Sequence, residues 1–525
     1  MKNLFKEPIL FQDYPDVDVI RVDDTFYMIS TTMHFTPGGV ILRSYNLIDW
    51  EIVSYVYETL DSTEAQRLEN SKNIYGKGMW AASLRHYKGK FYVCFVCNDT
   101  GKTYLYRSSS IEGPWEKSEI EGFYHDCSLY FEEIDGVERV FIVYGNTDVY
   151  LTELNETLTG PKQGGINRLL VSDRGNGVSL GYEGSHFYKI DGIYYLFMIH
   201  SKPGYWLRSE ACFTSDSLTD EFTGRDIYDT PGYRGAGIAQ GGIVDDVLGH
   251  YFLIIFQDRG ASGRIPYVLP VSINKEDVQV LGNETIYDEA ISNGIPVGDL
   301  IEKGLYPYDS NPGYEYTPLS TNELLDQDGN LNKQWQWNHE PDLSLILFEK
   351  EKNGITFRTT EVTSDLAQTK NVLTQRTIEY ESEMTVDIDA SDMNDGDVAG
   401  LAAFMGCYSY VAIEKDTDKY YLVMRGKELS KAGDDIWKNE APLEEFERCE
   451  IDSSIVTLKV TVKYKEKDTA IFAYKDASTG NYVKIGKEHE MAFRLDHFCG
   501  CRFGLFLYSR KRSGGKATFS CPVIS

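Results

Sequence analysis

One pattern recurs along the first 290 residues and constrains the fold more than any other feature. Each copy is a turn followed by two aromatic or equivalent residues and an apolar run, a combination that predicts hairpins and strands. The copies are DDTFYMIS (23–30), KGKFYVCF (88–95), GVERVFIVYG (136–145), DGIYYLFMI (191–199) and VLGHYFLIIF (247–256). Their spacing of roughly 50 to 65 residues is typical of a propeller with four-stranded blades. We therefore predict an all-β chain that begins with a five-bladed β-propeller and has almost no helix.

A second unit follows the repeat. Residues 301–322 are rich in Pro, Gly, Ser and Asn, which is the composition of a linker. Beyond them the repeat disappears, but short strand patterns continue and predict a β-sandwich. A chain of 525 residues also exceeds what one hydrophobic core usually serves. We predict a propeller over 1–300, a linker over 301–322, and a jelly-roll, lectin-like β-sandwich over 323–525.

The charge of the chain narrows its partners. A formal net charge of -29 argues against nucleic acid, because phosphate binding needs a basic face, and it equally disfavours anionic membranes. No apolar run approaches the length of a membrane span. Aromatic residues make up 13% of the chain, which suits surfaces that stack on sugars. A neutral or cationic ligand is therefore expected, and a homo-oligomer is left open.

Cysteine usage suggests the compartment. The nine cysteines are an odd number scattered from Cys94 to Cys521, and we interpret them as reduced thiols. The CFVC run has the spacing of a redox or zinc motif, but its place in an alternating strand pattern favours plain strand residues. The start MKNLFKEPIL lacks the apolar core of a signal peptide. We therefore expect a cytoplasmic protein.

Three acidic residues stand at related positions in the repeat. Asp16 precedes the inner strand of the first blade, Asp126 that of the third and Glu183 that of the fourth. Inner strands of a propeller converge on one axis, so residues at their ends meet although they are far apart in sequence. Any one of these acids alone would be a turn residue. Three together predict a common site, because their mutual repulsion makes convergence costly without a use.

These acids lie in motifs that resemble glycoside hydrolase family 43. In chain order the motifs are YPDVDVIRVDDTFYM, MWAASLRHYKGKFYV, HDCSLYF, EGSHFYKIDGIYYLF, AQGGIVD and FQDRGASGRIPYVLPV. Members of that family are five-bladed propeller enzymes that act on xylan and arabinan side chains and oligomers. The segments QWQWNHEPD, LTQRT and DGDVAGLAAF resemble the β-sandwich appended to the family's β-xylosidases. The resemblance implies an inverting exo-glycosidase that releases xylose or arabinose, or both, from xylo-oligosaccharides or arabinoxylan fragments.

The resemblance also implies roles for individual residues. Asp16 matches the general base, Glu183 the general acid, and Asp126 the third acid, which orients the general acid and adjusts its pKa. An inverting glycosidase separates its two catalytic carboxyl groups by roughly 6.5 to 9.5 Å, which leaves room for the attacking water. Arg264 matches a ligand of substrate hydroxyls beside the base.

Four further residues are candidates for sugar binding. Phe35 and Trp80 stand at positions that resemble the aromatic walls of the sugar subsite, with core packing as the alternative for Trp80. His34 is either a hydroxyl ligand or a loop residue. Gln240 stands where many family members have a histidine that contacts water or calcium, and an amide is a weaker metal ligand than imidazole. We therefore expect Gln240 to hold a water or a sugar hydroxyl, and we expect no cofactor and no metal.

Two alternatives remain for the activity. The first is an endo-acting xylanase or arabinanase of the same family, against which the sandwich counts, since that domain can block one end of a groove. The second is a non-catalytic sugar-binding propeller, which predicts damage at Asp16 or Glu183, whereas both acids are present. We further expect the glycine-rich segment 394–410 to reach the pocket and to bring Phe404 or Tyr408 near its rim, with core packing as the alternative.

Overall fold

Five four-stranded antiparallel sheets follow one another along the first half of the computed structural model, which describes residues 1–274, 277–429 and 441–525. The sheets are β1 (Asp18–Val22), β2 (Thr25–Ser30), β4 (Gly38–Ser44) and β5 (Glu51–Tyr57); β6 (Met79–Tyr87), β7 (Lys90–Cys97), β8 (Lys102–Ser108) and β9 (Glu116–Ile120); β10 (Ser128–Ile134), β11 (Val137–Asn146), β12 (Asp148–Leu154) and β13 (Asn167–Ser172); β14 (Glu183–Ile190), β15 (Ile193–Ser201), β16 (Arg208–Ser215) and β17 (Thr223–Tyr228); β18 (Ile238–Asp245), β19 (Tyr251–Asp258), β20 (Arg264–Asn274) and β21 (Asp277–Val280). These are the blades of a five-bladed propeller, so that prediction is confirmed.

Each recurring sequence pattern contributes the second strand of its blade. The apolar runs become β2, β7, β11, β15 and β19, which lie inside their sheets between two hydrogen-bonded neighbours. In β15 every residue is buried, because this strand packs on both faces against the neighbouring blades. The turn residues at the start of each copy reverse the chain from the inner strand, as between Val22 and Thr25.

The inner strands of the five blades surround one axis. Strand β1 contacts β6 and β18, β6 contacts β10, and β14 contacts β10 and β18. Arg85 of β6 links the inner strands of three blades: it donates to the Asp18 carboxylate at 2.6 Å, to the carbonyl of Leu129 at 2.8 Å and to the Ser128 hydroxyl at 2.6 Å. An ion pair and two hydrogen bonds therefore tie these three blades together.

The ring closes between the first and fifth blades through the segment that precedes β1. The amide of Ile9 donates to the carbonyl of Pro266 at 2.9 Å, and the amide of Tyr14 donates to that of Arg264 at 3.1 Å. Because Arg264 begins β20, this closure fixes the start of a fifth-blade strand beside the residues just before β1.

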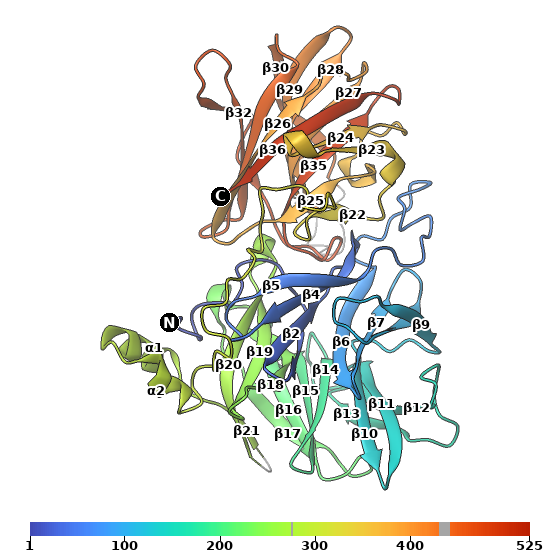
Figure 1. Cartoon of the computed structure of the whole chain (residues 1–525), viewed down its shortest axis with the longest axis vertical. Helices are drawn as coiled ribbons and strands as arrows, with labels where there is room; N and C mark the ends of the chain where they lie inside the picture. The colour runs from blue at the N-terminus through green and yellow to red at the C-terminus, as the bar shows by residue number, and fades with distance from the viewer. Residues whose placement is uncertain (275–276, 430–440) are drawn as a thin grey trace.

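Two short helices follow the propeller and project from its side (Figure 1). Helix α1 (Glu284–Ser292) is capped by Asn283, whose side chain accepts from the amides of Thr285 and Ile286, and α2 (Val297–Ile301) follows it. The prediction of an almost helix-free chain missed them, because only Tyr287, Ala290 and Leu300 are buried and the apolar stripe is too short to read from sequence. Within the described ranges, no helix combines the length and apolarity that crossing a membrane requires.

The segment predicted as a linker packs along the first blade. The Tyr314 hydroxyl donates to Glu51 at 2.6 Å, and the amide of Thr317 donates to the same carboxylate at 3.1 Å. Glu51 also pairs with Arg43. The connection between the two domains is therefore fixed to the propeller surface over part of its length.

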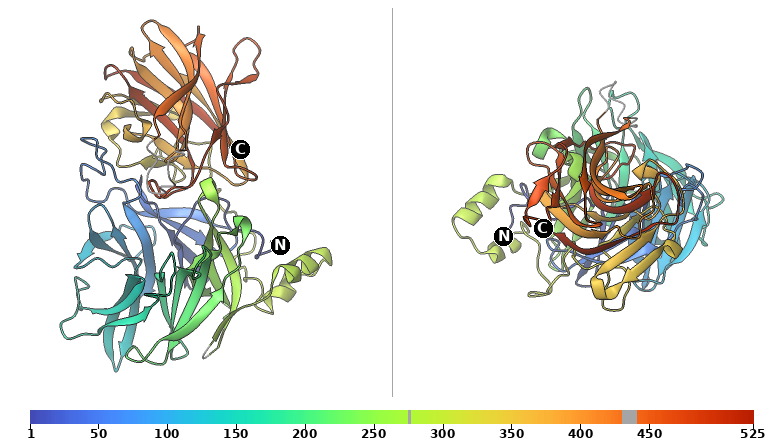
Figure 2. Two further views of the ribbon diagram at one scale, coloured as in Figure 1. Left: turned by 180° about the vertical axis from the view of Figure 1, so that it is seen from behind. Right: turned by 90° about the horizontal axis from the view of Figure 1, so that it is seen from above.

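Two antiparallel sheets form the C-terminal sandwich, which is stacked on one end of the propeller (Figures 1 and 2). One sheet has the order β3 (Phe35–Thr36), β22 (Gln336–Asn338), β25 (Leu373–Arg376), β35 (Arg502–Ser509), β27 (Asp397–Phe404), β28 (Ser409–Asp416), β29 (Lys419–Lys427) and β30 (Leu443–Ile451). The other has β23 (Ile346–Glu349), β24 (Gly354–Arg358), β36 (Lys516–Ile524), β26 (Glu381–Asp389), β31 (Ile455–Lys463), β32 (Thr469–Lys475) and β33 (Tyr482–Lys484), with β34 (His489–Glu490) paired to β32. The predicted all-β sandwich is thus confirmed.

The two domains share backbone structure. Strand β3 belongs to a propeller loop, yet it pairs with β22 and forms the edge of a sandwich sheet. The amide of Gly500, in the loop before β35, donates to the buried Asp13 carboxylate at 2.8 Å, and the amide of Cys501 donates to the carbonyl of Ala261 at 2.8 Å. The sandwich is therefore hydrogen-bonded to both the first and the fifth blade.

The close approach at Gly500 yields a testable prediction. A Cβ there would lie 2.5 Å from the carbonyl oxygen of Ser262 and 2.9 Å from the Cβ of Asp13, so Gly500→Ala must push the domains apart locally. We expect it to lower the free energy of unfolding by roughly 1–3 kcal/mol, measured by urea denaturation. Gly298→Ala is the control, because a Cβ in α2 meets nothing within 4 Å. Equal stabilities of the two variants would contradict the tight interface.

Candidate active site

A cavity of about 530 Å³ lies where the inner strands of the propeller begin, under the sandwich. Its walls include the three predicted acids Asp16, Asp126 and Glu183, together with Trp80, Gln240 and Arg264. Two larger hollows, of about 610 and 750 Å³, lie over the outer strands of the fourth and fifth blades and over the sandwich, and neither contains any of those acids. The convergence predicted from the sequence therefore occurs in the 530 Å³ cavity.

Asp16 is held by a buried ion pair. Its Oδ1 accepts from Nη1 of Arg264 at 2.7 Å, and both side chains are buried. Burial raises the pKa of Asp16, while the Arg264 guanidinium opposes that rise. Arg264 is itself fixed from the sandwich, since its Nη2 donates to the carbonyl of Phe498 at 3.2 Å and its guanidinium lies 4.4 Å from the Phe498 ring centre.

Asp126 and Glu183 meet through a histidine. Nε2 of His125 lies 3.3 Å from Oε2 of Glu183 and 3.6 Å from Oδ2 of Asp126. Burial lowers the pKa of His125, but the two carboxylates outweigh it and raise that pKa to about 9. Burial raises the pKa of Asp126 to about 7, with His125 opposing the rise and Glu183 adding to it. Asn146 also donates to Oε2 of Glu183. The imidazolium therefore lies between two carboxyl groups that would otherwise repel each other.

Unusual backbone conformations aim these side chains into the cavity. Asp16 and Asp126 have φ of 52° and 46° two residues before β1 and β10, and Gln240 has φ of 69° at a bulge in β18. Such values lie in the left-handed region, which costs free energy for residues other than glycine and is concentrated at functional sites. Gly184 takes the same conformation beside Glu183, where a Cβ would lie 2.7 Å from Cγ of Gln240.

One side of the cavity comes from the sandwich. Phe493, Arg494, Leu495 and Phe498, in the loop between β34 and β35, line it. The Phe498 ring packs edge-on to Trp80, with ring centres 5.8 Å apart. Trp80 is therefore a pocket-wall residue. The open side carries Trp206, which is 48% exposed.

The expectation that segment 394–410 reaches the pocket is wrong. Phe404 and Tyr408 are fully buried in the sandwich core, and the Tyr408 hydroxyl donates to Asp365 at 2.7 Å. The segment is the β27–β28 hairpin, whose small residues serve close packing between strands rather than an outward loop. The segment of residues 493–498, called loop 493–498 below, lies at the pocket where segment 394–410 was expected.

Phe35 and His34 also lie away from the cavity. Phe35 is in β3 at the domain interface, where the Arg502 guanidinium lies 3.4 Å from its ring centre. His34 is fully buried beside it, with ring centres 4.2 Å apart. The prediction of sugar contact is wrong for Phe35, and of the two alternatives for His34 the loop residue holds. The chain lines the cavity at Met33 and then turns into the domain interface.

Several pocket residues were not predicted. His125 and Asn146 contact Glu183, and Arg208 pairs with Asp258 at 2.7 Å on the cavity wall. For His125 a signal was present, since it directly precedes Asp126 in YHDCSLYF. The others depend on how blades and domains pack, which a local pattern does not encode.

His125, Asp126 and Glu183 also have the spacing of a metal site. Ligand atoms of His125, Asp126 and Glu183 lie within 4.8 Å of one another, which is close enough for one ion. Despite burial, the two carboxylates raise the pKa of His125 to about 9, so the imidazole is positively charged near neutral pH and pairs with both acids. The arrangement therefore suits proton transfer between carboxyl groups and a substrate.

Comparisons with known proteins agree with this fold. Residues 5–225 match glycosyl hydrolases family 43, and residues 327–521 match the beta xylosidase C-terminal concanavalin A-like domain. A beta-xylosidase of Formosa agariphila is 24% identical, over 97% of this chain and 88% of that protein. A xylosidase/arabinosidase of Humicola insolens is 24% identical, over 79% and 77%. A solved structure described as a bifunctional GH43-CE of Bacteroides eggerthii is 33% identical with a TM-score of 0.84, over 99% of this chain and 63% of that one, so this chain spans less than two thirds of it.

The His125 ion pairs make a prediction about pH. The pKa of His125 is raised from 6.5 to about 9, so its contribution to stability is complete below pH 6.5 and is lost as pH rises through 9. His125→Gln should therefore destabilise the protein by on the order of 2 kcal/mol at pH 6, and by much less at pH 9.5. Thermal unfolding at both pH values measures this. His86→Gln, at an exposed histidine, is the control, and a difference independent of pH would contradict the assignment.

Proposed function

Because the chain belongs to glycoside hydrolase family 43, we propose that it is an inverting exo-glycosidase that removes xylose, arabinose or both from the ends of xylo-oligosaccharides or arabinoxylan fragments. The observation that carries the proposal is the closure of the cavity that holds Asp16, Asp126 and Glu183. Loop 493–498 blocks one side, which leaves a pocket for a chain end rather than a groove for a continuous polymer. The names of the beta-xylosidase and xylosidase/arabinosidase relatives support this substrate class.

Asp16 is the proposed general base. The ion pair with Arg264 favours its ionised form and fixes the direction of Oδ1, while Oδ2 remains to draw a proton from water. The Arg264 guanidinium is also the proposed donor to a hydroxyl group of the sugar. Trp80 and Phe498 supply aromatic faces for the C–H groups of the sugar.

Glu183 is the proposed general acid. Its Oε2 accepts from Asn146 and faces His125, so we assign the transferable proton to Oε1. Asp126, which faces the same imidazole, is the proposed third acid that helps to orient Glu183 through His125. In the proposed single displacement, water activated by Asp16 attacks the anomeric carbon while Glu183 protonates the leaving oxygen on the other face.

Product analysis tests the proposal. Xylohexaose should yield free xylose and xylopentaose first, because the pocket admits one chain end. The first xylose should be the α-anomer, since one displacement inverts a β-linkage. Proton NMR in the first minutes of the reaction measures both the initial products and the anomeric form of the released xylose. Internal cleavage to shorter oligosaccharides would favour the endo-acting alternative, and a β-anomer would contradict the role of Asp16. Rates on p-nitrophenyl β-D-xyloside and α-L-arabinofuranoside identify the preferred sugar.

Variants of the two acids separate their roles. Asp16→Asn and Glu183→Gln should each lower kcat on xylobiose roughly 10²–10⁴-fold. With p-nitrophenyl β-D-xyloside the loss in Glu183→Gln should shrink, because this leaving group needs little protonation, whereas that in Asp16→Asn should persist. Asp23→Asn is the control, since Asp23 is an exposed turn acid of the same blade with φ of 55°. If both variants lost equally less activity on p-nitrophenyl β-D-xyloside than on xylobiose, the assignment of the two roles would be refuted.

A further inference from the structure

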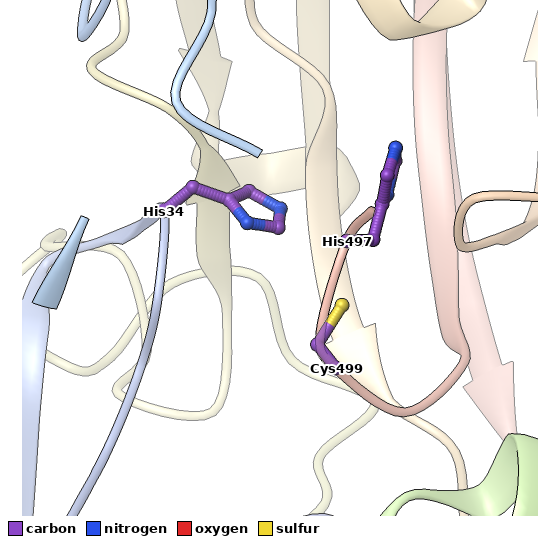
Figure 3. A group of neighbouring side chains, drawn as sticks. All are labelled: His34, His497 and Cys499. Carbon is purple, nitrogen blue, oxygen red and sulfur yellow. The ribbon is translucent and has the colours of Figure 1, made fainter. Parts of the chain in front are cut away.

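Three potential metal ligands meet at the interface between the domains. Ligand atoms of His34, His497 and Cys499 lie within 4.8 Å of one another, and all three residues are buried. Figure 3 shows the imidazole of His34 reaching from the propeller toward the sandwich loop, with the thiol of Cys499 pointing into the space between the two histidines. His497 and Cys499 flank Phe498, a wall residue of the catalytic pocket. The cluster itself lies outside that pocket.

The polar atoms of this cluster lack hydrogen bonds. Neither ring nitrogen of His34 has a partner among the residues that the structure describes, and the same holds for Nδ1 of His497. His34 has no exposed surface and touches the rings of Phe35 and Tyr75. Buried polar groups are nearly always paired, so an orphaned imidazole requires an explanation.

A neighbouring histidine shows what a satisfied ring looks like in the same interface. His339 is also fully buried, with its ring centre 5.1 Å from that of His34. Its Nε2 accepts from the amide of Ile74 at 3.0 Å, and its Nδ1 lies 3.2 Å from Oδ1 of Asn338. The lack of partners at His34 is therefore a property of that residue and not of the interface as a whole.

Burial favours ligation over ion pairing. Within the described part of the chain, His34 and His497 are buried without a carboxylate hydrogen-bonded to either ring, and a buried imidazole of this kind is neutral, which is the form that binds metals. A buried thiolate likewise needs a cation beside it, and Cys499 is buried in the same cluster. The Arg502 guanidinium acts against a further cation here, while the Asp13 and Asp496 carboxylates act in its favour.

We propose that His34, His497 and Cys499 bind one zinc ion that joins the propeller to loop 493–498. Two imidazoles and a thiolate are a ligand set typical of zinc, and three protein ligands leave the fourth tetrahedral position to water. On binding, the thiol proton of Cys499 passes to solvent and the thiolate sulfur coordinates the ion. The ion satisfies the His34 ring and holds both neighbours of Phe498.

Zinc binding by the full chain tests the proposal. After removal of metals with a chelator, equilibrium dialysis against zinc chloride should give one bound ion per chain, and zinc should raise the Tm, because a ligand of the folded state stabilises it. Cys499→Ser and His34→Gln should lose both the bound ion and the rise in Tm. Cys501→Ser is the matched control, since Cys501 is also buried, lies two residues along and is outside the cluster, so it should keep both.

Three results would overturn the proposal: no zinc on the unaltered chain, zinc retained by Cys499→Ser, or zinc lost only in His125→Gln, which would place the ion at the catalytic cluster. A spectroscopic measurement covers the case in which a variant fails to fold. The unaltered chain loaded with cobalt(II) should show a thiolate-to-cobalt charge-transfer band in the near ultraviolet. Bound cobalt without that band would exclude Cys499 as a ligand and the proposal with it.

Discussion

The Asp13 carboxylate is the contact on which the remaining structure depends. One oxygen accepts from the amide of Arg264 at 2.7 Å and the other from the amide of Gly500 at 2.8 Å, while the Asp13 carbonyl accepts from Arg376 at 2.8 Å. A single buried residue of the first blade thus joins the fifth blade and two parts of the sandwich. Because the side chain of Arg264 is the partner of Asp16, the contact that closes the ring also positions the candidate base. Ring closure, domain docking and pocket geometry therefore all depend on the contacts of Asp13.

The pocket concentrates negative charge and compensates it locally. Asp16 faces Arg264 on one side, while Asp126 and Glu183 share His125 on the other. Each cation is nearly buried, so solvent screens these pairs weakly, and the balance between carboxylate and cation decides which acid is ionised. The pKa of Asp126, about 7, shows that burial and neighbouring carboxylates prevail over a single imidazolium. A site of this kind can hold acids in different protonation states at one pH, which acid–base chemistry requires.

The sequence predicted the features that repeat locally and failed where distant segments pack. Turn and aromatic periodicity located the five blades, and Asp16, Asp126 and Glu183 were found because each stands at the start of an inner strand. The family resemblance, and not the periodicity, supplied Arg264 and Gln240. Segment 394–410 misled because glycine and alanine suit both an exposed loop and a tight hairpin, and only the packing of Phe404 decides between them. Loop 493–498 and the pairing of β3 with β22 depend on how two domains dock, which no short pattern records.

The position of loop 493–498 in the chain has a consequence for synthesis. The last propeller strand ends at Val280, and Phe498 is made 218 residues later (498 minus 280). At 5–20 residues per second, roughly 10–45 s separate the two on a ribosome. Domains fold as units in the order in which they emerge, so the propeller can form first with its three acids facing an unfinished, open pocket. During that interval Asp13 and Trp80 lack their sandwich partners. The nascent protein is therefore a folded propeller whose pocket still lacks the wall that loop 493–498 supplies.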